Sequence, residues 1–248
     1  MLCSEWIYSM SEEIKIPRLS ERLYEIATMV SQGNKVCDVG CDHGFVSIFL
    51  VAKNISPYVI AMDVRKGPLS MAKDHVQEYH VENYIETRLS DGLENYKSGE
   101  ADSLIIAGMG GPLMLRILER YPEKTENFKE LILQPQSEIP AFRARIRELG
   151  YEIVEEKMIF EEGKYYPMMK VVRSNQILRP YTELELMYGP LLLQEKNPIL
   201  QQFLLYEKTV IEKILDQVKN DASNHQDVLE KMTHRYELCK EALAELSR

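Results

Sequence analysis

The sequence has few cysteines, and their spacing disfavours a framework built on them. Only four cysteines occur among the 248 residues, at Cys3, Cys37, Cys41 and Cys239, which is too few and too scattered for a disulfide network. Cys37 and Cys41 lie four positions apart, but no second pair of Cys or His accompanies them, which disfavours a zinc site. We therefore expect these cysteines to be small buried side chains in a protein of the reducing cytoplasm.

Long apolar runs and an excess of basic charge are also missing. No stretch approaches the roughly 18 apolar residues of a membrane span, and Glu5 interrupts the N-terminal segment before a signal peptide could form. We therefore expect no membrane partner. The formal net charge is −9. Because Lys and Arg drive binding to phosphates, this balance gives no support to a nucleic-acid partner, although a local basic face would still allow one.

The sequence does contain a regular alternation of strand-like and helix-like segments. Hydrophobic residues make up 45% and charged residues 28% of the chain, as in proteins with a full core. Short apolar runs predict strands at residues 35–39, 58–63, 84–89, 103–107 and 131–136, then a hairpin at residues 151–172. Helical spacing predicts helices at residues 19–30, 45–51, 66–79, 113–120 and 141–149. This order predicts an α/β fold with a doubly wound sheet, which we assign to residues 1–178.

The character of the chain changes near residue 179. Gly189-Pro190 and Asn197-Pro198 interrupt regular structure, and two runs of helical spacing follow, separated by the polar segment 220–224. The apolar positions are Ile199, Phe203, Val210, Ile214 and Val218 in the first run, and Val228, Met232, Cys239, Ala242 and Leu246 in the second. We expect residues 179–248 to form a second domain, an antiparallel helical hairpin that amounts to a short coiled coil.

The first predicted strand runs into a turn that carries two glycines. Gly40 and Gly44 would let the backbone approach a ligand closely, and the following helix points free N–H groups at the same place. The G-x-x-x-G spacing departs from the dinucleotide pattern, and an acid ahead of the glycines would repel a pyrophosphate. Carboxylates instead favour the cationic sulfonium and amino group of S-adenosylmethionine. We therefore expect Asp38, Gly40, Asp42, His43 and Gly44 to bind this cofactor, with helix capping as the alternative for His43.

Acids also stand at the ends of the next two strands. Asp63 lies 25 residues after Asp38, close to the ~20 expected for a carboxylate that binds ribose hydroxyls. Asp63 and the adjacent Val64 are therefore candidate cofactor residues, and a solvated acid at a strand end is the alternative. Asp91 and Gly92 follow the third strand, where an adenine ring would lie, although an Asp-Gly turn alone would also explain them.

The fourth and fifth strands end in unusual segments. Three glycines occur within residues 108–111, and each costs conformational entropy on folding, so turn chemistry alone does not justify them. Such a loop makes room for a flat group. The fifth strand ends in Gln134 and Gln136, two amides on either side of a proline.

Four of these segments occur in an order that resembles a known family. They are Asp38-Val-Gly-Cys-Asp-His-Gly44, Arg88-Leu-Ser-Asp-Gly-Leu93, Ala107-Gly-Met-Gly-Gly111 and Leu133-Gln-Pro-Gln136. From residue 19 to the C-terminal helices, the sequence resembles the bacterial tRNA (adenine-N1)-methyltransferases that modify the adenine at tRNA position 22. The resemblance implies a Rossmann-like class I methyltransferase domain that binds S-adenosylmethionine, and a coiled-coil domain that helps to hold tRNA.

The resemblance also implies roles for individual residues. The methionine part of the cofactor would lie between Gly40 and Gly44, its ribose at Asp63 and its adenine at residues 91–92. Residues 107–111 would line the gap between the donor methyl group and the target base, so Ala107 and Gly108 join the cofactor residues. One departure is visible, because Cys41-Asp-His-Gly44 stands where the family favours Ser-Asp-His-Ala. The extra glycine keeps the backbone permissive.

For this reaction we expect catalysis to rest mainly on alignment. The N1 atom of adenine carries a lone pair and needs little proton transfer before it attacks a sulfonium methyl group. N1 is paired in a duplex, so the base must be extruded at a cost of a few kcal/mol. The candidate catalytic residues are Asp42, Met109, Gly110, Gln134 and Gln136, with Asp42 placed to orient the amino group of the base or accept its proton.

Other interpretations of the sequence remain open. The acidic balance favours a small-molecule methyltransferase, and the hairpin is compatible with a non-catalytic module that binds S-adenosylmethionine and a protein partner. An NAD-dependent oxidoreductase is the least favoured. The row Arg143, Arg145 and Arg147 reads as a solvated helix face, and it is also the first place where we expect a phosphate contact.

Overall fold

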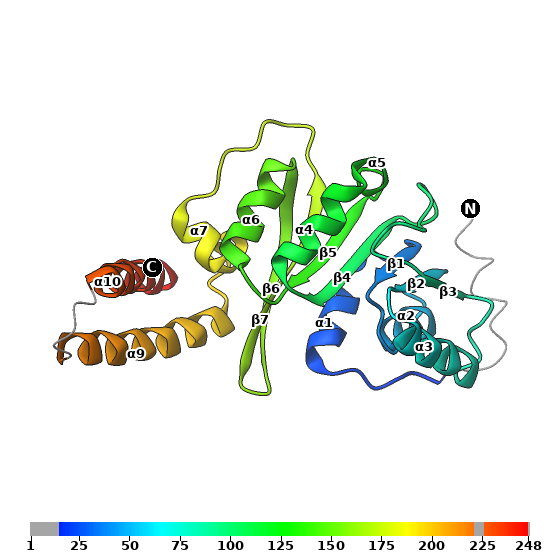
Figure 1. Ribbon diagram of the computed structural model, residues 1–248, viewed down its shortest axis with the longest axis horizontal. Helices are drawn as coiled ribbons and strands as arrows, with labels where there is room; N and C mark the ends of the chain where they lie inside the picture. The colour runs from blue at the N-terminus through cyan, green and yellow to red at the C-terminus, as the bar shows by residue number, and fades with distance from the viewer. Residues whose placement is uncertain (1–14, 221–225, 248) are drawn as a thin grey trace.

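The computed structural model describes residues 15–220 and 226–247, and a seven-stranded sheet forms the centre of this part of the chain (Figure 1). The strands are β1 (Val36–Val39), β2 (Val59–Asp63), β3 (Ile85–Leu89), β4 (Ser103–Met109), β5 (Glu130–Pro135), β6 (Tyr151–Glu161) and β7 (Lys164–Arg173). Their order is β3-β2-β1-β4-β5-β7-β6. Strands β1 to β5 are parallel, and β7 pairs antiparallel with β5 and β6. The predicted α/β fold, with its terminal hairpin, is confirmed.

The parallel pairing brings the polar strand ends together. Val39 lies beside Met62 on one side and Ile106 on the other, and Asp63 lies beside Leu89. Strands β1, β2 and β5 are buried along their whole length, which explains why they read as continuous apolar runs. Because the carboxyl ends of parallel strands meet at one edge, a ligand site at that edge is expected.

Helices cover both faces of the sheet (Figure 1). One face carries α1 (Glu21–Thr28), α2 (Phe45–Ala52) and α3 (Lys66–Glu78), and the other carries α4 (Gly111–Arg120), the short α5 (Pro122–Thr125) and α6 (Ile139–Glu148). Each layer has its own core cluster. Ile26, Ile48 and Val76 belong to the first cluster, and Met114 and Phe142 belong to the second.

The glycine loop after β4 is shorter than the sequence predicts. The strand continues through Met109 and α4 begins at Gly111, so Gly110 is the single residue that joins them. Met109 lies beside Pro135 of β5, after a register shift that begins at Ala107. Gly108 lies within this shift at a φ of +76°, a conformation that glycine adopts readily. Pairing with β5 therefore draws two residues of the expected loop into the sheet.

In the described part of the chain after the sheet there are four helices, and the last two pack against each other (Figure 1). They are α7 (Glu183–Tyr188), α8 (Pro190–Gln194), α9 (Pro198–Asn220) and α10 (Gln226–Leu246). The buried apolar residues of α9 are Leu200, Leu204 and Ile211, whereas Ile199 and Phe203 are only half-buried. The face predicted for the start of α9 is therefore wrong by one position. On α10, Cys239, Ala242 and Leu246 are buried as predicted, but Val228 is exposed.

A domain boundary between residues 178 and 179 remains a proposal. That position lies between the end of β7 at Arg173 and the start of α7 at Glu183. The chain on either side of it is in contact, because α7 packs on α6 and α8 packs on β6.

A buried ion pair fastens the α7–α8 segment to the sheet. Arg143 is 1% exposed and its Nε donates to Glu156 Oε1 at 3.1 Å. Its Nη1 donates to the carbonyl of Leu186 at 2.8 Å, and Glu156 Oε2 accepts from the N–H of Leu191 at 3.0 Å. Burial raises the pKa of Glu156, and the Arg143 guanidinium opposes that shift. The prediction of a solvated arginine row is therefore wrong for Arg143, because its partner lies on another element.

The described cysteines confirm the prediction made from composition. Cys37, Cys41 and Cys239 are buried and free, as predicted, and Cys3 lies outside the described residues. Within residues 15–220 and 226–247, no helix combines the length and the apolar character that crossing a membrane requires.

Candidate functional site

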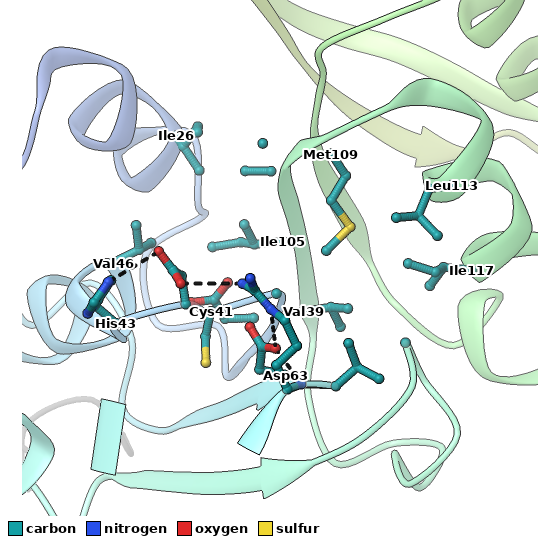
Figure 2. A pocket seen from close by; sticks show the side chains of 18 of the residues that line it. Ile26, Val39, Cys41, His43, Val46, Asp63, Ile105, Met109, Leu113 and Ile117 are labelled. Carbon is teal, nitrogen blue, oxygen red and sulfur yellow. Dashed lines mark hydrogen bonds and ion pairs between the residues drawn. The ribbon is translucent and has the colours of Figure 1, made fainter. Parts of the chain in front are cut away.

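A cavity of about 500 Å³ opens at the carboxyl edge of β1, β2 and β4 (Figure 2). Its wall includes twelve of the fifteen residues predicted for the site, which are Asp38, Gly40, Asp42, His43, Asp63, Val64, Asp91, Gly92, Ala107, Gly108, Met109 and Gln136. Gly44, Gly110 and Gln134 are not part of that wall. The cavity has the size of a small-molecule or cofactor site.

The turn after β1 brings two elements of the site into close contact. Gly40 has a φ of +78° and its N–H donates to the carbonyl of Met62 at 2.8 Å. A Cβ atom at Gly40 would lie 2.2 Å from Cε of Met109, whose side chain extends into the cavity (Figure 2). Gly44 instead begins α2 and lies against Ala72, 3.1 Å from where its own Cβ would be. Gly40 therefore shapes the cavity, and Gly44 allows α2 to pack on α3.

Asp38 is a buried carboxylate at the base of this turn. It is 5% exposed, and its Oδ2 accepts a hydrogen bond from Ser47 Oγ at 2.7 Å. Burial raises the pKa of Asp38 to about 6, against the opposing effect of the Ser47 hydrogen bond, and the charge of Asp63 adds to the rise. An ionised Asp38 would gain from a cationic ligand, because a positive charge offsets the cost of burying the carboxylate.

Asp63 is the second buried carboxylate, at 4% exposed. Its Oδ1 accepts from the backbone N–H of Arg65 at 2.8 Å, and the Arg65 Nε lies 3.6 Å away. Arg65 Nη2 also lies 3.5 Å from Asp42 Oδ1, and Asp42 Oδ2 lies 3.6 Å from His43 Nε2 (Figure 2). The Arg65 and Asp42 side chains are 66% and 58% exposed, so these pairs are weak and a ligand can displace them.

His43 does not cap α2, so that alternative is wrong. Gly44 occupies the N-cap position, and no side-chain hydrogen bond caps the helix. The His43 ring stacks beside Phe45 with centroids 6.2 Å apart, and its carbonyl lies 2.9 Å from Nδ1 of His75. His43 therefore forms part of the rim of the cavity.

Asp91 and Gly92, which follow β3, line the cavity beside an apolar wall. Gly92 has a φ of +55°, and a Cβ atom there would lie 3.0 Å from Ile117. Ile117 and Leu113 of α4 line the same side of the cavity (Figure 2). Asp91 forms an ion pair with Arg120, with Oδ2 and Nη1 separated by 2.8 Å. The apolar side chains of this wall suit an aromatic ring, and the Asp91 carboxylate lines the same cavity.

The two amides on β5 have different positions. Gln134 is fully buried, and its Oε1 accepts from the N–H of Gly108 at 3.1 Å and from Arg22 Nη1 at 3.2 Å. Gln136 lines the cavity, and its N–H donates to the carbonyl of Met109 at 2.8 Å. Only Gln136 is therefore placed to touch a ligand directly.

Two arginines of the cavity wall were missed from the sequence. Arg22 comes from α1, and its guanidinium lies over the ring of Tyr166, 5.5 Å from the centroid. Its position between the apolar residues of an amphipathic helix gave no sign of a site. Arg65 follows two predicted cofactor residues directly, and that proximity was a usable signal.

The chemistry of the cavity is that of binding and alignment. Among the described residues, no group of three or more His, Cys, Asp or Glu side chains could hold a metal ion. Cys41 lines the cavity, but burial raises the pKa of its thiol well above the usual range, so it stays protonated at neutral pH. The buried carboxylates of Asp38 and Asp63, the apolar wall beside Gly92 and the glycine turn after β1 fit an S-adenosylmethionine molecule.

Comparisons with known proteins agree with this geometry. Residues 19–169 match the family described as "Methyltransferase domain". The chain is 31% identical over 232 residues to the tRNA (adenine(22)-N(1))-methyltransferase of Bacillus subtilis (strain 168), which covers 91% of this chain and 97% of that protein.

Two solved structures with cofactor compounds are also similar. Sp1610 of Streptococcus pneumoniae, in complex with S-adenosyl-L-methionine, has a TM-score of 0.81 and 30% identity over 91% of this chain and 100% of that chain. TrmK of M. capricolum, in complex with S-adenosyl-homocysteine, has a TM-score of 0.79 and 26% identity over 92% of this chain and 99% of that chain.

Proposed function

This chain belongs to the tRNA (adenine(22)-N(1))-methyltransferase family, and from that premise we propose that it methylates N1 of adenine 22 in tRNA with S-adenosylmethionine as the methyl donor. The arrangement of residues around the cavity supports placing this reaction there. The buried carboxylates of Asp38 and Asp63 lie at one end of it, and Met109 and Gln136 line its wall at the ends of β4 and β5. A donor and an acceptor can therefore meet in a single cavity.

Bound S-adenosylmethionine supplies a sulfonium methyl group, and its transfer forms the N1–C bond as the S–C bond breaks, leaving the electron pair on sulfur. Asp63 accepts the hydrogen bonds of the ribose hydroxyls, since a carboxylate at this strand end has two acceptor oxygens. Asp38, held by Ser47, favours the cationic part of the donor. Gly92, with the wall formed by Ile117, holds the adenine of the donor.

The acceptor side is formed by the ends of β4 and β5. Gln136 donates or accepts at the edge of the target base, and Met109 packs against its face. Gln134 acts as a positioning residue, because its buried carboxamide holds both the Gly108 backbone and Arg22. Gly110 acts only through the backbone, as the link between β4 and α4. Asp42 lies at the exposed rim, where it can orient the amino group of the base.

The substrate accounts for the remaining parts of the proposal. We place the protein in the cytoplasm, where tRNA is found, and assign the α9–α10 pair, within a C-terminal domain of residues 179–248, to tRNA binding. The net charge of −9 implies that this contact relies on local features rather than on a broad basic surface.

The test is a methylation assay with purified protein and unmodified tRNA, read by mass spectrometry of the tRNA nucleosides. We expect N1-methyladenosine from the wild-type protein and a large loss of donor affinity in Asp63→Asn. Asp74→Asn, on the exposed surface of α3, is the matched control and should behave as wild type. Binding of the donor without any N1-methyladenosine would contradict the proposal, and turnover of a small molecule that tRNA does not inhibit would favour the alternative methyltransferase.

A further inference from the structure

A second cleft, of about 440 Å³, lies beside the acceptor side of the cofactor cavity. It is formed where the end of β5, the β6–β7 turn and α9 come together. The side chains that matter here are Gln136, Ile139, Lys164, Tyr165, Tyr166 and Phe203. Of these side chains, the methyl-transfer chemistry described above uses Gln136 alone.

Aromatic rings dominate the surface around this cleft. Tyr165 lies at the centre, with ring centroids 4.6 Å from Phe160, 5.1 Å from Phe203 and 6.2 Å from Tyr206. Phe160 is 41% exposed and Tyr206 is 60% exposed. Aromatic side chains that gather in an exposed position indicate a binding surface, because such a cluster is otherwise costly in water.

The cleft adjoins the cofactor cavity. Gln136 lines both of them. Arg22 lines the cofactor cavity, and its guanidinium lies over the ring of Tyr166, which lines the cleft. A nucleic-acid strand whose target base enters the cavity would therefore pass over the aromatic cluster.

The charges around the cleft favour a base over a phosphate as its occupant. Among the described residues that line this cleft, Lys164 is the cation, and Glu161 and Glu162 precede it in the sequence. Attraction of a phosphate is therefore weak here. Stacking of a base on an aromatic ring needs no positive charge and is available to every base.

Extraction of the target adenine supplies such a base. When a nucleotide leaves its stack, its neighbour loses a stacking partner, and single-stranded RNA is commonly held by bases stacked on Tyr and Phe. We propose that this cleft binds an unpaired base of the tRNA next to the target adenine, by stacking on Tyr165. The proposal rests on the proposed function and adds a tRNA-binding site to it.

The test compares steady-state methylation of tRNA by wild type, Tyr165→Leu and Tyr165→Phe. Removing a stacking ring is expected to raise the KM for tRNA roughly tenfold in Tyr165→Leu, whereas Tyr165→Phe keeps the ring and should stay within about twofold of wild type. The affinity for S-adenosylmethionine, measured by calorimetry, should be unchanged in both. Tyr79→Leu, a half-buried tyrosine at the C-cap of α3, is the matched control for loss of a ring elsewhere.

A second variant protects the test against misfolding. Tyr206→Ala changes a side chain that is 60% exposed, and a rise of roughly threefold in the KM for tRNA is expected because this ring flanks Tyr165. A KM within twofold of wild type for both Tyr165→Leu and Tyr206→Ala, with normal product from the wild type, would overturn this inference alone. Absence of N1-methyladenosine from the wild type would overturn the proposed function as well. If the wild type self-associates in sedimentation and Tyr165→Leu does not, at unchanged KM for tRNA, the inference would be overturned and the cleft assigned to a second copy of the chain.

Discussion

Replacing Asp38 by asparagine tests two effects of the buried carboxylate, its cost to the stability of the fold and its contribution to donor binding. Burial raises the pKa of Asp38 from 3.8 to about 6, so between these values the folded chain holds a proton that the unfolded chain releases. Stability is therefore lost as the pH rises through this window. From the two pKa values, burying the carboxylate costs about 2 kcal/mol at pH 5 and about 3 kcal/mol at pH 8.

The assay is urea unfolding of wild type and Asp38→Asn without donor, from pH 5 to pH 8. The free energy of unfolding of Asp38→Asn, minus that of wild type, should rise by about 1 kcal/mol across this range, because other titrating groups cancel in the difference. The same variant should bind S-adenosylmethionine at least tenfold more weakly, since it lacks the charge that faces the donor.

Two outcomes would refute this reasoning. A difference in unfolding free energy that is flat from pH 5 to pH 8, or that falls with pH, would mean that Asp38 is not the buried acid described here. Unchanged donor affinity would mean that the carboxylate has no role in binding. Ser47→Ala supplies an independent check, because loss of its hydrogen bond should move the Asp38 titration above pH 6.

Three further changes test the cavity and its supports. Gly40→Ala should lower stability by about 1 kcal/mol and weaken donor binding, and Gly40→Ala with Met109→Ala should recover only part of this, because the φ of +78° remains unfavourable; calorimetry and thermal unfolding measure both. Gln134→Leu should lower kcat with little change in donor affinity, since two donors lose their acceptor, and an unchanged kcat would exclude a positioning role. Arg143→Met should cost roughly 3–5 kcal/mol in urea unfolding, and adding Glu156→Gln, which removes the charge but keeps an acceptor for the Leu191 N–H, should restore part of that loss; a double variant no more stable than the single one would show that the unpaired charge of Glu156 is not the cause.

The succession of strands along the chain and the acids at the ends of the first two were predictable from the sequence, and physical reasons explain this. Buried parallel strands read as apolar runs, and in the first two of them an acid, Asp38 or Asp63, closes the apolar run. Asp38 and Asp63 stand out because they are local signals of this kind. The cavity forms around these acids and the residues that follow them, since the sheet brings the strand ends to one edge. Ala107 and Gly108 of its wall were expected from the family resemblance alone.

What escaped the sequence depends on contacts between distant residues. The extension of β4 through Met109 comes from pairing with β5, and helix and loop propensities do not contain it. Arg143 reads as a surface arginine until Glu156, on another element, is placed beside it. The first turn of α9 offers two apolar positions, Ile199 and Leu200, and spacing alone does not decide which one faces α10.

The most direct measurement of the central claim is reverse transcription of tRNA after reaction with the wild-type protein and S-adenosylmethionine. A methyl group on N1 blocks the pairing edge of adenine, so we expect a stop at position 22 that appears only when donor and enzyme are both present. A tRNA with guanine at position 22 should give no such stop. A stop at another adenine, or full-length product from a tRNA shown by mass spectrometry to carry the transferred methyl group, would contradict the account.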